Sequence, residues 1–397
     1  MSRGKMPIYL VSSRLSGFVM TFSDKTKISY KIVLLCSGLL FFNSLCAEQR
    51  HFYQRVGPSH IEYEYRFSSP SGQTHKIKFK LDRIETDSSR GLFTRTAKHR
   101  LTQEAKQEAA NLFNTLQEQY IEQARNEFNV YINEQARRLP SGINIDNENK
   151  GKNIRASSDG TISKAKAERI IDEFLQAMNV TWKTINQAHI DAFQIEIDKR
   201  TQKHYIDTYK QAYYVASFSD IHDKSYNLRI DFDQVAKLQA AALKPIADAI
   251  ARNTRGFSKR EVVNYTAHFI QSIPYDTLNS RDAHGETGFV APLTLFDINK
   301  GDCDTKSTAL AAILFNLYPS MNIKMVLIPN HAFLAIHLDT ESADTAIVYH
   351  DREYVVVEAA GPALTSIGES YDSSLRHMQD NPGKIGRIIS LLDKKSS

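Results

Sequence analysis

The sequence is poor in the residues that mark several common protein classes. Its 397 residues include 3 cysteines, 17 glycines and 11 prolines, which excludes a disulfide-dense scaffold, a collagen-like chain and a wholly disordered one. It contains neither an HExxH motif nor a CxxC pair, and no glycine-rich phosphate loop, so these signatures of zinc and nucleotide sites are missing. Hydrophobic residues make up 42% of the chain, which is ordinary for a globular protein with a sizeable core.

The sequence also lacks an apolar run long enough to span a bilayer, which takes about 20 residues. Near the N-terminus, an eleven-residue apolar run at 32–42 (IVLLCSGLLFF) follows a basic stretch that ends at Lys31. A run of this length is typical of the central part of a secretory signal peptide. We therefore predict a signal peptide at 1–47, with Met20 as a more usual start than Met1. The mature chain is then expected to be periplasmic or secreted, with no membrane span.

Both the charge and the cysteines are concentrated in this segment. The chain carries a formal charge of +5, and residues 1–47 contain six basic residues and one acidic residue, so the remainder is formally neutral. The charge consequently predicts export rather than nucleic-acid binding. Cys36 and Cys46 also lie here, which leaves Cys303 alone in the mature chain and rules out an internal disulfide. A lone cysteine is either a small buried hydrophobe or a reactive thiol.

Alternating apolar residues predict a small sheet in the first region of the mature chain, 48–95. They occupy 61–67 and 77–81 on either side of a Pro-Ser-Gly turn, which is the pattern of a β-hairpin. A matching strand follows much later, at 226–232. We expect the residues between to be an insertion into this sheet.

The inserted region, 96–215, has helical periodicity. Apolar residues recur every three to four positions over 101–131 and again over 170–193, and a polar loop at 140–160 separates the two runs. This pattern predicts an antiparallel helical hairpin, or coiled coil, with about 40 residues in each arm. Its narrow apolar stripe is typical of a solvated arm, and a docking surface for a partner protein is the alternative interpretation.

The sequence predicts no metal site and no other cofactor. Asp146, Glu148 and Asn149 resemble part of a calcium loop, but Lys150 occupies a position that should supply an oxygen ligand. Two histidines, at 331 and 337, would share one face of a strand, yet no third zinc ligand accompanies them.

The last region, 216–397, carries the strongest chemical signal. Residues 238–251 predict a helix, and a capping box of Ser258 and Glu261 opens another helix that Pro274 ends.

Cys303 is the centre of that signal. It follows Gly301 and Asp302 and precedes an apolar run of helical period, so we expect it in the first turn of a buried helix. Unpaired backbone N–H groups and the helix dipole at this place would stabilise a thiolate or an oxyanion. Such a position suits a nucleophilic cysteine.

Chain geometry brings a histidine back to this cysteine. A helix from Cys303 to about Leu317 runs roughly 22 Å away from the thiol at about 1.5 Å per residue. A strand at 323–328, about 20 Å long, can return along it. The Pro-Asn turn at 329–330 then leaves His331 at the start of the next strand, near the thiol, where it can act as base and proton carrier.

Two acids compete for the third position, which orients and charge-stabilises the imidazole. In a simple meander of strands 346–350 and 353–358, the turn at Asp351 returns to the His331 end. If 346–350 instead prolongs the outgoing arm of a long hairpin, the return strand brings Glu358 to that end. Strand counting leaves both open.

Three stretches around these residues carry a family resemblance: GDCDTKSTALAAIL from Gly301, NHAFLAI from Asn330 and YVVVEAAGP from Tyr354. With FIQSIPYD and PLTLF upstream, they are similar to the transglutaminase-like superfamily, in particular its bacterial cysteine-peptidase-like members, over residues 240–392. The resemblance implies an α+β fold with a papain-like core and an antiparallel sheet, and the inserted helical hairpin predicted from periodicity lies outside it.

The resemblance further implies a catalytic triad of Cys303, His331 and Glu358, although the acid of the family is most commonly aspartate. It also suggests an oxyanion contribution from upstream of the cysteine, for which Tyr275 and Gln271 are the candidates. We therefore expect an exported enzyme that cleaves an amide bond of a protein or peptide through a thioester acyl-enzyme, by hydrolysis or acyl transfer. The alternative is a non-catalytic binding or adaptor protein that acts through its helical arm.

Overall fold

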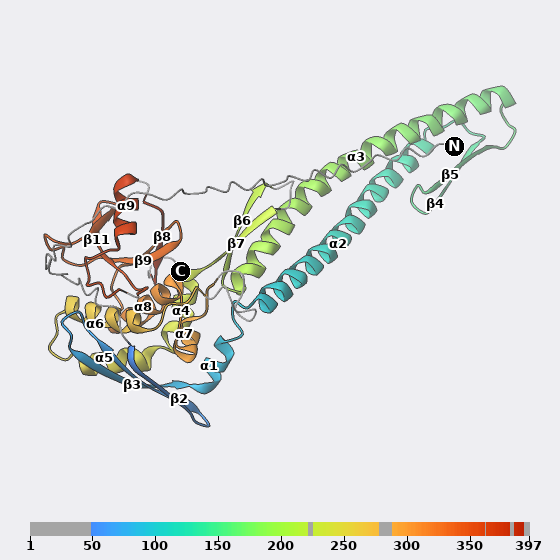
Figure 1. Ribbon diagram of the computed structural model, residues 1–397. Coiled ribbons are helices and arrows are strands. Elements are labelled where there is room, and N and C mark those ends of the chain that lie inside the picture. The colour runs from blue at the N-terminus through green and yellow to red at the C-terminus, as the bar shows by residue number, and fades with distance from the viewer. Residues whose placement is uncertain (1–48, 221–224, 278–287, 362, 382–384, 393–397) are drawn as a thin grey trace, which may run out of the picture. The chain divides into compact units, whose positions relative to one another are not determined.

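A computed structural model describes residues 49–220, 225–277, 288–361, 363–381 and 385–392 (Figure 1). The signal peptide predicted at 1–47 lies outside these residues. Within them, the chain forms a mixed α+β fold of nine helices and several antiparallel sheets. None of the described helices is both long and apolar enough to cross a membrane.

The first region forms a three-stranded antiparallel sheet in the order β1–β2–β3. The strands are β1 (Gln49–Val56), β2 (His60–Ser68) and β3 (Thr74–Asp82). The predicted hairpin is β2–β3, and β1 adds an edge strand that was not predicted from the apolar pattern. Alternate residues of β2 and β3 are buried, and the ring of Tyr65 packs 5.1 Å from that of Phe269 in a later helix.

The helical arm is slightly longer than its apolar pattern predicted. A short helix, α1 (Arg83–Ser89), precedes α2 (Arg95–Ala136), and α3 (Lys164–Gln211) returns beside α2. The two arm helices have 42 and 48 residues. Aromatic contacts such as the ring pair of Phe128 and Trp182, 5.2 Å apart, contribute to the seam between them.

The segment between the arm helices is a β-hairpin rather than the polar loop that its composition indicated. β4 (Ile143–Glu148) pairs with β5 (Asn153–Ser158) in antiparallel register. The tight turn forms because Asn149, Lys150 and Gly151 adopt positive φ angles of 53°, 54° and 83°, a conformation that glycine and asparagine tolerate well. The residues that resembled a calcium loop therefore form a strand end and a turn.

A two-stranded sheet follows the arm. β6 (Tyr214–Asp220) and β7 (Ser225–Ile230) pair with each other, and Tyr214 lies opposite Ile230. The strand expected near 226–232 therefore exists, but the prediction that it matches the N-terminal hairpin is wrong. β6 precedes it directly along the chain and is the nearer partner, and Phe232 already belongs to the next helix.

Five helices precede the last sheet. The single helix expected at 238–251 is two helices, because Pro245 lacks a backbone N–H and starts a helix more readily than it continues one. The predicted capping box of Ser258 and Glu261 is present. The helices are α4 (Phe232–Ala240), α5 (Lys244–Asn253), α6 (Lys259–Ser272), α7 (Pro292–Ile298) and α8 (Cys303–Leu317).

A five-stranded antiparallel sheet completes this region, with the strand order β10–β11–β9–β8–β12. The return strand β11 lies between β10 and β9, so the order of a simple meander is wrong. The elements are β8 (Ile323–Ile328), β9 (His331–Ile336), β10 (Ala346–Tyr349), β11 (Arg352–Val357), α9 (Asp372–Asp380) and β12 (Arg387–Leu391).

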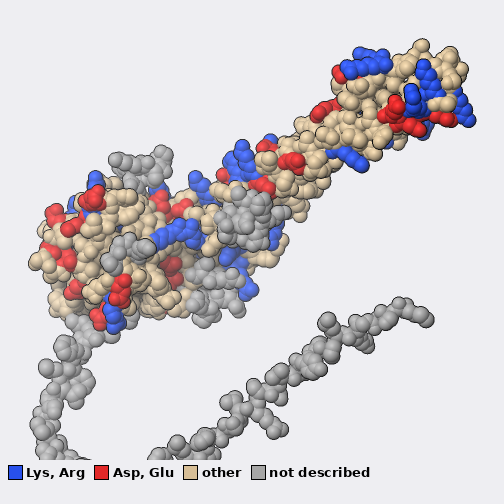
Figure 2. Space-filling view, turned by 90° about the horizontal axis from the view of Figure 1, so that it is seen from above, with Lys and Arg blue, Asp and Glu red and all other residues tan. Residues whose placement is uncertain are grey.

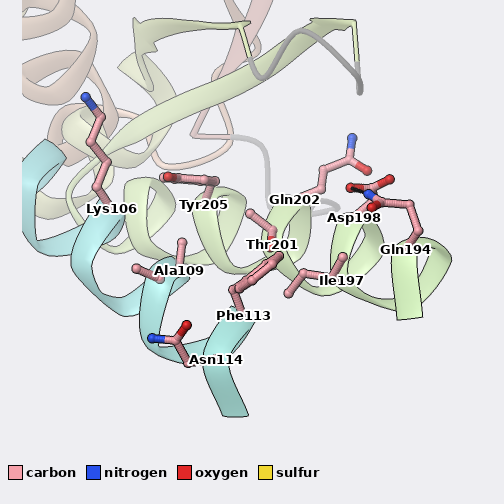
Figure 3. Close-up of a pocket in the computed structure, with 11 residues that line it drawn as sticks. Lys106, Ala109, Phe113, Asn114, Gln194, Ile197, Asp198, Thr201, Gln202 and Tyr205 are labelled. Atoms are coloured by element: carbon pink, nitrogen blue, oxygen red, sulfur yellow. Dashed lines mark hydrogen bonds between the residues drawn. The ribbon is translucent and has the colours of Figure 1, made fainter. Parts of the chain in front are cut away.

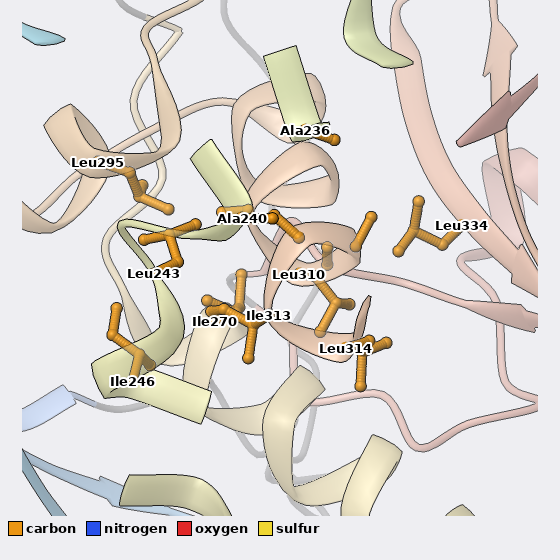
Figure 4. Packing of buried hydrophobic residues seen from close by; sticks show 14 of the residues in the cluster. Ala236, Ala240, Leu243, Ile246, Ile270, Leu295, Leu310, Ile313, Leu314 and Leu334 are labelled. Atoms are coloured by element: carbon orange, nitrogen blue, oxygen red, sulfur yellow. The ribbon is translucent and has the colours of Figure 1, made fainter. Parts of the chain in front are cut away.

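Helix α8 lies at the centre of the hydrophobic core (Figure 4). Leu310, Ile313 and Leu314 are fully buried, with side chains of α4 to α6 on one side and Leu334 of β9 on the other. Burial of one such side chain contributes about 1.5–3 kcal/mol. Cys303, the first residue of α8, is therefore carried by a helix that the core holds firmly.

We expect Phe269→Ala to lower the free energy of unfolding of this region by about 3–5 kcal/mol. Phe269 is fully buried in α6, and its ring lies 5.1 Å from that of Tyr65 and 6.0 Å from that of Phe296. Urea unfolding followed by near-UV circular dichroism measures the loss. Ile195→Ala, at a side chain that is 72% exposed on α3, is the control and should change the value by less than about 0.5 kcal/mol. Equal losses would contradict this packing.

Candidate active site

Cys303 begins α8, and backbone pairing holds the loop before it. Gly301 donates its N–H to the carbonyl of Pro274 at 3.2 Å and accepts from the N–H of Asp276 at 3.1 Å. Asp302 then caps the helix by accepting from a first-turn N–H at 3.1 Å. Cys303, the nucleophile candidate, therefore begins a helix, and hydrogen bonds hold the loop that leads into this helix.

His331 begins β9, which packs against α8. The backbone N–H of the next residue, Ala332, is close enough to lower the pKa of the Cys303 thiol. Ser307 of α8 donates its hydroxyl to the carbonyl of Ala332 at 3.4 Å. The start of β9 thus lies near the N-terminal end of α8, as the lengths of α8 and of the return strand β8 predicted.

Glu358 follows β11 directly and is hydrogen-bonded to His331. Its Oε2 lies 2.7 Å from Nε2 of the imidazole. Its Oε1 accepts from the hydroxyl of Ser370 at 2.9 Å and from the N–H of Tyr371 at 3.4 Å. The side chain of Glu358 is fully buried, so these bonds replace its lost hydration. Because Nε2 is engaged, Nδ1 is the imidazole nitrogen that can face a thiol.

Asp351, the other candidate acid, lies at the opposite end of β11. It is exposed and occupies the turn between β10 and β11 with a φ of 59°. β11 runs antiparallel to β9, with Val357 opposite Leu334, so the end of β11 and not its start lies near His331. Of the two acids that the sequence left open, Glu358 is the one beside the imidazole.

The surroundings of Cys303 favour a protonated thiol. Burial, followed by the nearby carboxyl groups of Asp304 and Asp302, raises the pKa of the thiol to about 12, although backbone N–H groups of Ala332 and Asp304 act in the opposite direction. Burial and the proximity of Asp304 also raise the pKa of Asp302 to about 10. The sequence predicted that the helix N-terminus would stabilise a thiolate, but burial and the nearby carboxyl groups favour the protonated thiol. A base must therefore take the proton.

The two oxyanion candidates are in different situations. Tyr275 is 42% exposed, and burial and the proximity of Cys303 raise its pKa to about 12, so its hydroxyl remains a hydrogen-bond donor beside the thiol. Gln271 is buried, and its amide nitrogen donates to the carbonyls of Glu358 and Thr365 at 2.9 Å and 3.0 Å. Gln271 thus holds the segment after β11, and Tyr275 is the donor near the thiol.

Three residues around the site were not predicted from the sequence patterns. Ser370 and Tyr371 support Glu358, and the ring of Tyr371 lies 5.6 Å from that of His331. They stand in a loop without hydrophobic periodicity, which gave no signal. Lys306 is fully buried on α8, and a lysine within such an apolar helix was a signal that could have found it.

The histidines do not assemble a metal site in the part of the chain that the structure describes. Within it, no group of three or more His, Cys, Asp or Glu side chains could hold a metal ion. His331 is bonded to Glu358, and Nδ1 of His337 lies 2.9 Å from the carbonyl oxygen of Glu353. These two rings are therefore engaged with different partners.

A separate hollow of about 390 Å³ lies between α2 and α3 (Figure 3). Ala109 and Thr201 are small enough to leave it open, and Phe113 and Ile197 line it with apolar surface. Its lining residues include neither a cysteine nor a histidine. The hollow is therefore a feature of the arm and separate from the Cys303 site. On the face of the arm that Figure 2 shows, charged side chains gather at the tip and are sparser along the middle.

We expect Glu358→Gln to slow the reaction of Cys303 with iodoacetamide at neutral pH by about tenfold or more, because a neutral amide stabilises an imidazolium less well. Asp351→Asn is the matched control and should leave the rate unchanged, since Asp351 lies at the far turn. Mass spectrometry of the Cys303 peptide over time measures both rates. The reverse ranking would identify Asp351 as the acid.

Comparison of the chain with family models, with curated proteins and with solved structures gave no match. The transglutaminase-like resemblance therefore stays a prediction from the motifs around Cys303, His331 and Glu358. What can be inferred about function therefore depends on the geometry of these side chains.

Proposed function

We propose that this chain is a cysteine-dependent amide hydrolase or acyl transferase with a transglutaminase-like core. The observation that carries the proposal is the 2.7 Å hydrogen bond between Nε2 of His331 and the buried Glu358, at the start of a strand that is hydrogen-bonded to α8 through Ala332 and Ser307. A thiol at a helix start, an imidazole at a strand start and an acid behind it suit a nucleophile, its base and the group that orients the base. The antiparallel sheet packed against α8 supports a papain-like core.

In the proposed reaction, Nδ1 of His331 takes the thiol proton as the sulfur of Cys303 attacks an amide carbonyl. The hydroxyl of Tyr275 and first-turn N–H groups of α8 donate to the developing oxyanion. His331 returns the proton to the leaving amine as the C–N bond breaks, and a thioester remains on Cys303. Water, deprotonated by His331, then attacks the thioester and breaks the C–S bond, which releases a carboxylic acid and restores the thiol. Glu358 orients the imidazole and stabilises its protonated form.

Proteins or peptides are the proposed substrates, and water is the default acceptor. Hydrolysis and acyl transfer share the first half-reaction, and transfer requires an amine to reach the thioester before water does. The scheme uses groups of the chain itself and no cofactor. The leader predicted at 1–47 makes a periplasmic or secreted location part of this proposal.

A second candidate function is binding or adaptor activity through the helical arm, and exposed apolar side chains favour it. Val130 of α2 and Val180 and Ile195 of α3 are 57%, 59% and 72% exposed, whereas the outer faces of a solvated helix are usually polar. Loss of function on removal of residues 98–210, together with full function of Cys303→Ser, would identify this role.

The test of the catalytic proposal is the rate at which iodoacetamide alkylates Cys303 in the wild type and in His331→Ala. With its base, the wild type should react about 100-fold faster at neutral pH. In His331→Ala, the rate should keep rising with pH towards about 12, because the raised pKa of the thiol leaves little thiolate below it. His337→Ala is the matched control and should behave as wild type. Equal rates in wild type and His331→Ala would exclude the triad.

A further inference from the structure

Lys306 is a charged residue enclosed by the protein beside the candidate site. It is fully buried on α8, three residues after Cys303, so the two are neighbours on the surface of the helix. Its Nζ donates to the carbonyl of Ile273 and, at 2.5 Å, to that of Ala360. Removing an ammonium group from water costs several kcal/mol, and lysines are rarely buried without a partner charge or a specific role.

The two carbonyls belong to segments that carry other members of the site. Ile273 caps the end of α6 and stands two residues before Tyr275. Ala360 stands two residues after Glu358. From its place on α8, the ammonium of Lys306 therefore bonds to the segment of the oxyanion candidate and to the segment of the acid. A single side chain joins the three parts of the site.

Lys306 also lies near other ionisable groups of the candidate site. Asp302 and Asp304 raise the pKa of Cys303, because carboxylates repel a thiolate. Burial lowers the pKa of Lys306 to about 7, and the charges of Asp302 and Cys303 act in the opposite direction. The ammonium is thus close enough to interact with the thiol, and its positive charge favours the thiolate.

We propose that Lys306 is a positioning residue for the cysteine chemistry: its ammonium ties the segments of Tyr275 and Glu358 to α8, and its positive charge favours the thiolate of Cys303. The inference rests on the proposed function. It gives Lys306 no contact with substrate and no proton transfer. The ammonium favours the thiolate while Lys306 is charged, which is the case below its own pKa and ceases as the pH rises through it.

The test compares alkylation of Cys303 by iodoacetamide in wild type, Lys306→Met and Lys306→Gln on both sides of pH 7. Methionine retains the volume without the charge, and glutamine retains an N–H donor for the carbonyls without the charge. Both variants should react about tenfold more slowly than wild type in acid. The ratio should approach one above about pH 7, where wild-type Lys306 loses its proton.

Lys324→Met is the matched control. Lys324 is also buried, but it lies on β8 and donates to the hydroxyl of Ser390 at 2.8 Å. Its replacement should leave the rate ratio at one at every pH. If the role of Lys306 were purely structural, its replacement would lower the stability of the protein but would not make the rate ratio change with pH.

A rate ratio that does not vary with pH in folded Lys306→Met, or wild-type behaviour of Lys306→Gln, would overturn the inference. If Lys306→Met does not fold, Lys306→Gln serves for the comparison because it keeps a donor for Ile273 and Ala360. Failure of the inference alone leaves the dependence of the wild-type rate on His331 intact. Loss of that dependence would instead remove the proposed function and the inference with it.

Discussion

The buried carboxyl group of Glu358 is the constraint around which the site is organised. A charged group taken out of water is costly unless donors satisfy its lone pairs. Glu358 obtains these donors from His331, Ser370 and Tyr371, which come from the start of β9 and from the loop before α9. These segments must therefore converge on the end of β11, and their convergence brings the imidazole to the first turn of α8.

The segment that follows Glu358 is fixed by the helices on which the rest of the site is built. Gln271 of α6 donates to the carbonyl of Glu358 itself, and Lys306 of α8 donates to that of Ala360. Gly361 has a φ of 67°, and a Cβ there would lie 2.6 Å from the carbonyl oxygen of Gln271, so the close approach to α6 requires glycine. The acid is thus held by rigid elements on two sides, which is what a preorganised site needs.

The sequence predicted those elements whose hydrophobic period matches their burial. α8 begins at Cys303, and β8 spans Ile323–Ile328 as expected, because both are core elements. Strand counting could not choose between Asp351 and Glu358, since the position of β11 between β10 and β9 depends on pairing between distant residues, and only the family resemblance pointed to Glu358. The β4–β5 hairpin was missed because it depends on turn residues with positive φ. Lys306 escaped notice because its role depends on carbonyls 33 and 54 residues away.

In the proposed reaction, Cys303 carries the acyl group of a substrate as a thioester. The most direct measurement is mass spectrometry of the Cys303 peptide after the wild-type protein has been incubated with an envelope extract and quenched in acid. We expect an added acyl mass on Cys303 that hydroxylamine removes and that is strongly reduced in His331→Ala. An unmodified Cys303, together with equal consumption of the peptides of the extract by wild type and Cys303→Ser, would contradict the proposed reaction.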